Sequence, residues 1–423
     1  QNMPTQFLSS DNTLTRKAAR YEVGMLADQL TPGGSLTDAF GRLRISTPFT
    51  VFDSQHRYVD NGKWDTFAVN GASATHMPLE SAMNLTVVPV TDSEVVRETR
   101  RVMPYQPGKS LLIMSTFAMA TPNANLRQRV GYFGAENGIY LENSGGYNWF
   151  VLRTSSLGSG IQEFRVRQDD WNGDKFDGYG YSERTLDVSK TQIFWIDIEW
   201  LGVGDVRCGF VSHGKPVVAH TFHNDGEQTT AYMTTACLPI RYEIKNLGSA
   251  SGTMKQICST VISEGGYEQT TRQWAATRTS PIVSTTDWKP VVSIRLKAGR
   301  TDGIVIPSQT HIVGDGNNSI YEYALIRNAA ISNGNWVTHA ASTGVEYNVT
   351  ATTMTMTNAS IEESGLFASS NQSSQLVNST LEYRFDHQLG RTIAGVSDTF
   401  TLAARHLLTG GNMYGTLNWN AIV

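Results

Sequence analysis

The sequence predicts an all-β protein with an N-terminal extended arm, a central jelly-roll β-sandwich and a smaller C-terminal β-sandwich. Composition is the first reason: only 17% of the 423 residues are charged and 40% are hydrophobic, while glycine (38 residues), threonine, serine and asparagine are abundant. That mixture is typical of strands and turns rather than helices. Spacing is the second reason. From Lys109 onward, short apolar runs recur about every 10 to 15 residues with no helical pattern between them, as in two-sheet sandwiches.

Residues 1–80 are the least regular part of the chain and are predicted to form the arm, an attachment segment. Apolar residues between positions 14 and 25 recur at helical spacing, so one short helix is expected there, ended by Pro32 and two glycines. The rest of the segment keeps neither a helical nor a strand period. Because such a segment cannot bury a core alone, we expect it to become ordered against a neighbouring subunit.

Residues 81–275 are predicted to form the central jelly roll. Runs such as SLLIMSTFAM, NWFVLR and VRCGFV have strand composition, and Asn137-Gly138 between two such runs indicates a hairpin. The clearest alternation is TQIFWIDIEW, where one face carries Phe194, Ile196, Ile198 and Trp200 and the other carries Ile193, Trp195, Asp197 and Glu199. We expect the first face to pack inward and the second to be partly solvated.

Residues 285–423 are predicted to form the second, smaller sandwich. The stretch before them, residues 268–290, is polar, rich in threonine and broken by two prolines, so we interpret it as the boundary between the two domains. Beyond it the strand pattern resumes in VVSIRLK, IYEYALIRN and DTFTLAA.

Charge, hydropathy and motif content disfavour several function classes. A net charge of −4 offers no general attraction for nucleic acid. No apolar run approaches the ~20 residues that span a bilayer, so we expect a soluble protein with no membrane partner. Nucleotide, dinucleotide, serine-hydrolase and zinc-protease motifs do not occur, so no cofactor is expected. Three widely spaced cysteines, Cys208, Cys237 and Cys258, are interpreted as buried free thiols.

The segment WIDIEW resembles the E-x-D-x-E strand of retaining β-glucanases of the laminarinase and lichenase type, whose two glutamates act as nucleophile and acid/base. Asp197 and Glu199 match that pattern, but Trp195 stands at the position of the nucleophile, and an indole cannot form a glycosyl ester. We therefore predict that the protein is not an enzyme and has no catalytic residues. Sugar binding is the alternative for this region, with Trp149, Trp171 and Trp195 stacking on sugar rings beside Asp197 and Glu199.

The segment DDWNGDKFDG has part of the oxygen-ligand spacing of a calcium loop. Its candidate ligands are Asp170, Asn172, Asp174 and Asp177. Lys175 replaces the glycine that such loops require, and no glutamate closes the loop, so a turn built on Asn-Gly explains the residues more simply. His220 and His223 are three residues apart and fall on opposite faces of an extended strand. We therefore expect no metal site in either segment.

The pattern D-A-F-G-R-L-R-x-S-x-P-x-T-x-F-D, from Asp38 to Asp53, resembles a segment of many virion structural proteins of tailed bacteriophages. The likeness continues through RVGYFGAENGIYLE, DDWNGDKFDG and TLDVSKTQIFWIDIEWLGVGDVRCGF to LPIRYEI, covering residues 35–270. It implies a structural protein on the particle surface, either an appendage such as a fibre or spike or a capsid decoration, anchored through its N-terminal segment. The implied partners are capsid, portal or tail proteins. The implied assembly is a homo-oligomer, with a trimer favoured because fibres are usually trimeric.

The same N-terminal segment carries the residues expected to dock on another virion protein. The set combines arginine forks with large aromatic rings, as interface centres do: Phe40, Arg42, Arg44, Phe49, Phe52, Arg57 and Tyr58. The alternative is a strand laid over the chain's own sandwich, and both uses can hold for different parts of the segment. At the level of function, the alternative is a receptor-binding protein whose lectin-like domain binds, or hydrolyses, host surface glycan.

Overall fold

A computed structural model describes residues 45–422 except 157, 159, 227, 269–270, 301, 316–317, 340–343, 371–375 and 381–384. The chain divides into two units, residues 1–48 and residues 49–423, and every described strand belongs to the second. The helix expected between positions 14 and 25, and three of the expected docking residues (Phe40, Arg42 and Arg44), lie outside the described residues.

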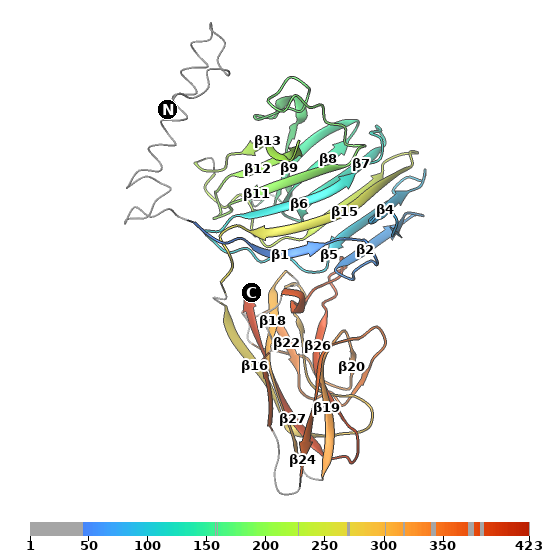
Figure 1. Cartoon of the computed structure of the whole chain (residues 1–423), viewed down its shortest axis with the longest axis vertical. Coiled ribbons are helices and arrows are strands. Elements are labelled where there is room, and N and C mark those ends of the chain that lie inside the picture. The colour runs from blue at the N-terminus through green and yellow to red at the C-terminus, as the bar shows by residue number, and fades with distance from the viewer. Residues whose placement is uncertain are drawn as a thin grey trace, which may run out of the picture. The chain divides into compact units, whose positions relative to one another are not determined.

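Two antiparallel sheets form the first sandwich, which is of the predicted jelly-roll type (Figure 1). The eight-stranded sheet, called sheet 1, has the order β13 (Lys215–Phe222), β12 (Val206–Ser212), β11 (Gln192–Ile198), β6 (Leu111–Ala118), β15 (Gly252–Ser263), β4 (Ala82–Val87), β3 (Ser73–Met77), with β1 (Phe49–Ser54) also paired to β15. The seven-stranded sheet, called sheet 2, has the order β10 (Gln162–Arg167), β9 (Tyr147–Thr154), β8 (Gly138–Ser144), β7 (Leu126–Phe133), β14 (Ile240–Asn246), β5 (Glu94–Thr99), β2 (Trp64–Val69).

Alternation along the strands builds the core between these sheets. In β14, Ile240, Tyr242 and Ile244 are fully buried, while the charged residues between them face away. Phe150 and Trp171 stack in this core with ring centroids 4.1 Å apart. Burying one large apolar side chain of this kind contributes about 1.5–3 kcal/mol. The Asn137-Gly138 hairpin is confirmed, because β7 and β8 pair up to Phe133 and Gly138.

The expected arm of residues 1–80 is too long, because β1, β2 and β3 all lie inside it and belong to the sandwich. Phe52 and Trp64 are core residues, 1% and 5% exposed, with their rings 5.9 Å apart. β1 was hidden in the sequence because it contains a bulge between Thr50 and Phe52, which interrupts the period of two that marks a strand.

Two further antiparallel sheets form the second sandwich. The four-stranded sheet has the order β16 (Arg272–Val283), β27 (Asn412–Ile422), β18 (Ile304–Asp315), β25 (Leu376–Thr380). The six-stranded sheet has the order β21 (Val337–Thr338), β22 (Val345–Asn348), β17 (Lys289–Leu296), β26 (Thr399–His406), β19 (Ser319–Arg327), β24 (Ser360–Ser369). A separate pair, β20 (Ala330–Ser332) and β23 (Thr353–Thr355), completes the described strands.

The stretch interpreted as a domain boundary, residues 268–290, contains the whole of β16. β16 pairs only with β27 in the described sheet, so it is an edge strand. Edge strands tolerate polar residues and proline because one of their sides needs no ladder hydrogen bonds, and Pro281 lies where the β16–β27 register shifts. The polar composition therefore marks an edge of the second sandwich.

The structure agrees with part of what the sequence predicts for the three cysteines. Cys208, Cys237 and Cys258 are free thiols. Cys208 is buried, and burial raises the pKa of its thiol. Cys258 is exposed, contrary to expectation, because it lies at the irregularity between Gln256 and Ser259 in β15. No helix within the described residues is long and apolar enough to cross a membrane.

Candidate functional site

The three tryptophans expected to form a sugar-stacking surface lie in three different environments. Trp149 is on the face of sheet 2 that points away from the core, Trp171 is inside the core at 1% exposure, and Trp195 is on the outward face of sheet 1. Alternation within one strand is visible in a sequence, but the assignment of β9 and β11 to opposite sheets is not. The expected glycan-binding set is therefore wrong.

Trp195, Asp197 and Glu199 do not form an open site either. The Trp195 indole lies across Gly209 of β12, and a Cβ atom on that glycine would come within 2.8 Å of the indole Cζ2. Asp197 is buried and ion-paired with Arg207. Glu199 lies beyond the end of β11 and is exposed. The segment therefore resembles the β-glucanase strand in sequence, but its carboxylates do not form an open site in the structure.

The calcium candidates use their oxygens to hold the chain. Asn172 binds β13 in both directions, donating to the Thr221 carbonyl at 2.9 Å and accepting from its N–H at 2.8 Å. Asp174 accepts from backbone N–H groups, and so does Asp177. Asp170 is exposed. Within the described residues, no three His, Cys, Asp or Glu side chains are grouped closely enough to hold a metal ion.

Four of the residues expected to dock on another virion protein are described by the structure, and some lie in the core while others lie on the surface: Phe49, Phe52, Arg57 and Tyr58. Phe52 is a core residue, so it is not available to a partner. Phe49 packs against Tyr267 and Phe385 of its own chain, with centroids 5.9 and 5.8 Å apart. For β1, the alternative of a strand laid over its own sandwich is therefore correct. Tyr58 is 85% exposed, with the Arg57 guanidinium 5.2 Å from its ring centre.

Sequence reasoning missed the outward face of sheet 2, which carries a lattice of charged side chains. We call it the arginine–glutamate face; its members alternate with core residues on β7, β8, β9, β10 and β14 and are Arg127, Arg129, Glu142, Arg153, Glu163, Arg165, Arg241 and Glu243. The signal was present in LRQRV, YLEN and RYEIK, where charges recur with a period of two inside apolar strands. Which arginine meets which glutamate depends on strand register, so the lattice itself could not be predicted.

Glu243 is the centre of this lattice. It is 2% exposed and accepts from Arg127 at 2.7 Å, from Arg241 at 3.1 Å and from Arg129 at 3.4 Å. Next to it, Arg129 donates to Glu142 at 2.6 Å, and Arg165 also pairs with Glu142. Because every one of these carboxylates has an arginine partner, their burial leaves no uncompensated negative charge.

Tyr140 fixes the neighbouring part of the same face. Its hydroxyl donates to Glu163 at 2.8 Å and accepts from Arg153 at 3.1 Å, and the guanidinium groups of Arg129 and Arg153 lie 5.2 and 5.1 Å from its ring centre. Tyr140 pairs with Gly131 on β7, and the two backbones pass so close that a Cβ atom on Gly131 would come within 2.5 Å of the Ile139 carbonyl oxygen and 2.6 Å of Tyr140 Cα. The result is a rigid polar surface.

The pKa values of this face are unsuited to proton transfer near neutral pH. Burial alone would raise the pKa of Glu243, but the charges of Arg241, Arg129 and Arg127 outweigh it and lower the pKa to about 2. For Glu163, burial is likewise outweighed by hydrogen bonds from Arg153 and Tyr140, so its pKa is lowered. Burial raises the pKa of Tyr140 above its ordinary value. These groups therefore act as fixed charges and dipoles, not as acids or bases.

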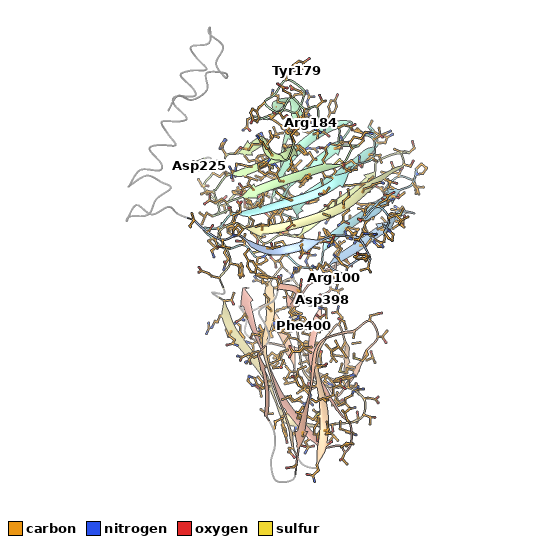
Figure 2. All side chains as sticks on the ribbon, in the orientation of Figure 1. Arg100, Tyr179, Arg184, Asp225, Asp398 and Phe400 are labelled. Atoms are coloured by element: carbon orange, nitrogen blue, oxygen red, sulfur yellow. The ribbon has the colours of Figure 1, made fainter. Side chains whose placement is uncertain are left out.

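The two sandwiches meet through a reciprocal pair of buried carboxylates. Arg100, after β5, pairs with Asp398 of the second sandwich (Figure 2). Arg391 of the second sandwich donates to Glu98 of β5 at 2.8 Å. Asp398 also accepts from Arg327 at 3.3 Å. Burial alone would raise the pKa of Asp398, but the charges and hydrogen bonds of its partners, Arg100 first, hold it below its ordinary value. An apolar cluster completes the junction: Val102, Ile304, Ile306 and Phe385.

Each ion pair of the junction lines a cavity. The Arg100–Asp398 pair borders a cavity of about 340 Å³, and the Glu98–Arg391 pair borders one of about 410 Å³. Both sizes are at the small end of ligand sites. The cationic side chains around the first cavity are paired with Asp398, Glu362 or Asp386, and the buried Nη1 atom of Arg101 is left without a hydrogen-bond partner.

No family model and no curated protein matches this chain. Among solved structures, it is similar to a protein of unknown function from Shewanella oneidensis (9% identity, 62% of this chain and 97% of that chain covered, TM-score 0.35). It is also similar to an endo-acting O-glycanase of human gut bacteria (12% identity, 51% and 99% covered, TM-score 0.36). A third is a carbohydrate esterase from the Shiga toxin-encoding bacteriophage phi24B (10% identity, 52% and 100% covered, TM-score 0.32). At such identities and TM-scores, these likenesses carry no argument about what this chain does.

Proposed function

We propose that the protein is a non-enzymatic structural protein of a bacteriophage particle, displayed on the particle surface and attached through residues 1–48. One observation carries this proposal. The segment that resembles phage virion proteins, Asp38 to Asp53, spans the boundary between the two compact units, because the second unit begins at Phe49. The end of the segment is strand β1 in sheet 1. Residues 1–48 are therefore joined directly to a strand of the first sandwich.

The chemistry of the body supports a non-enzymatic role. Asp197, Glu142 and Glu243 are each held by arginine, and the pKa of Glu243 lies far below neutral. A glycosidase needs one protonated and one ionised carboxyl group flanking the same bond, and these groups supply neither the proton nor an open position. Two sandwiches joined by buried ion pairs make a stiff body of the kind a particle surface requires.

Presence in the particle tests this role. Purified particles of a phage that encodes the protein are analysed by quantitative mass spectrometry, and the copy number relative to the major capsid protein is measured. We expect a fixed, integer-like ratio that survives salt washing. Absence from washed particles would contradict the proposal. In parallel, release of reducing ends from laminarin and lichenan by the purified protein is measured, and we expect none above background.

A second candidate function, binding of host surface polysaccharide, is favoured by one specific observation: two tyrosines, Tyr179 and Tyr181, are 95% and 86% exposed on a loop of the first sandwich. A particle protein with exposed aromatic rings of this kind can hold a sugar polymer through repeated weak contacts. The proposed homo-oligomer, with a trimer favoured, would multiply them.

A further inference from the structure

The loop between β10 and β11 crosses from sheet 2 to sheet 1 and is fastened at its start. Trp171 stacks on Phe150 in the core. The next residues run along edge strand β13: Asn172 makes its two bonds to Thr221, and the N–H of Gly173 donates to the Ala219 carbonyl at 2.9 Å. The segment thereby protects the free edge of β13. Residues 174–186, which come next in the chain, are named the tyrosine loop.

Asp174 is the internal support of the tyrosine loop. Its carboxylate is 6% exposed and accepts from the N–H of Phe176 at 2.8 Å and from the N–H of Ser182 at 2.5 Å. Gly180 passes so close that a Cβ atom there would come within 2.7 Å of Asp174 Cγ. One carboxylate thus holds both ends of the stretch that contains the two tyrosines.

Backbone contacts close the loop further, and some of them require unfavourable backbone angles. Asp177 forms a β-bridge with Thr185, and the N–H of Leu186 donates to the Phe176 carbonyl at 2.9 Å. Phe176 and Glu183 have φ angles of +50° and +51°, which side chains with a Cβ atom adopt at a cost of about 1–3 kcal/mol. Such strain persists where the surrounding structure imposes it, so these two residues are held in place by the contacts of the loop.

This frame holds Tyr179 and Tyr181 in the solvent. They are 95% and 86% exposed, and Figure 2 shows Tyr179 on the outermost part of the first sandwich with Arg184 of the same loop below it. An exposed phenol ring on a rigid support loses little conformational entropy on binding, which is why tyrosine is frequent in recognition loops. The two rings therefore present preformed contact surfaces.

We propose that Tyr179 and Tyr181 form a binding site for uncharged sugar units of a bacterial surface polysaccharide. The inference rests on the second candidate function, polysaccharide binding, and names its site. The apolar C–H face of a pyranose ring packs on a phenol ring, while its hydroxyl groups can bond to the charged side chains of Glu183 and Arg184, which are exposed in the same loop. Neither step requires a pocket.

Charge and size select this class of ligand over others. Residues 174–186 contain two basic and three acidic side chains, a net charge of −1. That charge disfavours nucleic acids and acidic polysaccharides. A stable protein partner needs about 800 Å² on each side, far more than a pair of protruding tyrosines. A free small molecule is normally enclosed over most of its surface, and rings this exposed enclose nothing. A neutral polymer gains affinity from repetition instead.

The test measures retardation of the full-length protein during native electrophoresis through gels that contain one polysaccharide each. Dextran, levan, mannan and galactan serve as neutral probes, and alginate serves as the acidic probe. We expect concentration-dependent retardation by at least one neutral polymer and none by alginate. The double variant Tyr179→Ala/Tyr181→Ala should weaken the binding about tenfold or more, as expected for loss of an anchor residue.

Two variants act as controls. Tyr58→Ala removes a tyrosine of similar exposure, 85%, from a different part of the surface and should change binding less than about twofold. Tyr179→Phe/Tyr181→Phe keeps both rings and should stay within about threefold of the parent, because stacking does not need the hydroxyl group. Neither tyrosine supports the core, so thermal unfolding of all three variants should match that of the parent protein.

Three results would overturn the inference: no retardation by any neutral polymer, undiminished binding by the double alanine variant, or an equal loss in Tyr58→Ala. Failure of the particle role is distinguishable from these. If the protein is absent from washed particles but the tyrosine variants lose sugar binding, only the particle role is wrong. If the protein is present in particles and binds no polymer, only the sugar site is wrong.

Discussion

At the scale of single residues, two glycines on the sheets leave room for close neighbours that a Cβ atom would meet. Gly209 leaves room for the Val217 carbonyl oxygen and the Trp195 indole on sheet 1, and Gly131 lets the backbone of β8 approach closely at Ile139 and Tyr140 on sheet 2. Neither glycine has a positive φ, so the requirement is space and not backbone freedom. In the sequence, VRCGFV and RVGYF have the composition of ordinary strands. The reason for their glycines is visible only when the neighbouring strands in the sheet are known.

Gly209→Ala should therefore destabilise the protein although both residues suit a strand. The new methyl group would come within 2.0 Å of the Val217 carbonyl oxygen and 2.8 Å of the Trp195 ring, and relieving such crowding typically costs about 1–3 kcal/mol, and more where the backbone has to shift. Urea unfolding at equilibrium measures the change. Gly134→Ala is the matched control, because its nearest neighbour would be Pro239 Cδ at an ordinary 3.7 Å, and it should change the free energy of unfolding by less than about 0.5 kcal/mol. Equal effects of the two substitutions would contradict this account.

Glu243 should make the stability of the protein depend on pH in the acid range. Its pKa falls from an ordinary 4.5 to about 2 in the folded protein, so the unfolded chain takes up this proton first. The stabilisation is present above pH 4.5 and is lost as pH falls toward 2. At ~1.4 kcal/mol per pH unit, about 3 kcal/mol is at stake.

The variant Glu243→Gln checks this assignment. It should lower the free energy of unfolding at pH 7 by about 3 kcal/mol and flatten its dependence on pH between 4.5 and 2. Exposed Glu136, changed to Gln in the same way, should leave both quantities within about 0.5 kcal/mol of the parent. An unaltered acid dependence in Glu243→Gln would mean that other groups govern it.

At the scale of secondary-structure elements, the sequence predicted the class of the fold well and the limits of the domains poorly. Strands with uninterrupted alternation, such as β11 and β14, could be recognised from local pattern alone. β1 could not, because its bulge breaks the period, and β16 could not, because it is a polar edge strand containing Pro281. Both errors placed folded residues outside the sandwiches.

Two N-terminal deletions distinguish the expected arm, residues 1–80, from the residues that precede the first described strand, 1–48. Removing residues 1–47 leaves every described strand intact, so the truncated protein should unfold at the same temperature as the full chain. Removing residues 1–80 also deletes β1, β2 and β3, with Phe52 and Trp64 from the core, and should abolish folding of the first sandwich. Near-UV circular dichroism during heating reports both outcomes. A cooperative transition of the first sandwich in the longer deletion would show that these strands are dispensable.

The candidate sites illustrate the same division between local and non-local information. Trp149, Trp171 and Trp195 share a residue type but not a face, since register and sheet assignment are set by partners far along the chain. The arginine–glutamate face has a local signal, charges with a period of two, and its pairing is again non-local. The exposure of Tyr179 depends on Asp174, five residues earlier, whose backbone contacts are invisible in the letters DKFDGYGY.

At the scale of the whole described body, buried ion pairs couple the two sandwiches. Asp398→Asn leaves Arg100 and Arg327 without a buried negative charge, which should cost about 3–5 kcal/mol. Differential scanning calorimetry should show one transition for the parent protein and two for the variant, as the sandwiches become independent. Asp169→Asn, which breaks the exposed pair with Arg167, is the control and should cost at most about 1 kcal/mol. A single transition in both variants would contradict coupling through Asp398.

The central claim is that residues 1–48 attach a self-contained body to a phage particle. The most direct measurement compares full-length protein with protein lacking residues 1–47, each supplied during growth of a phage whose own copy is deleted, with incorporation quantified by mass spectrometry of washed particles. We predict full incorporation of the complete chain and loss of at least about nine-tenths of it for the truncated, still folded chain, a change of about tenfold in occupancy. Equal incorporation of the two proteins would contradict the claim.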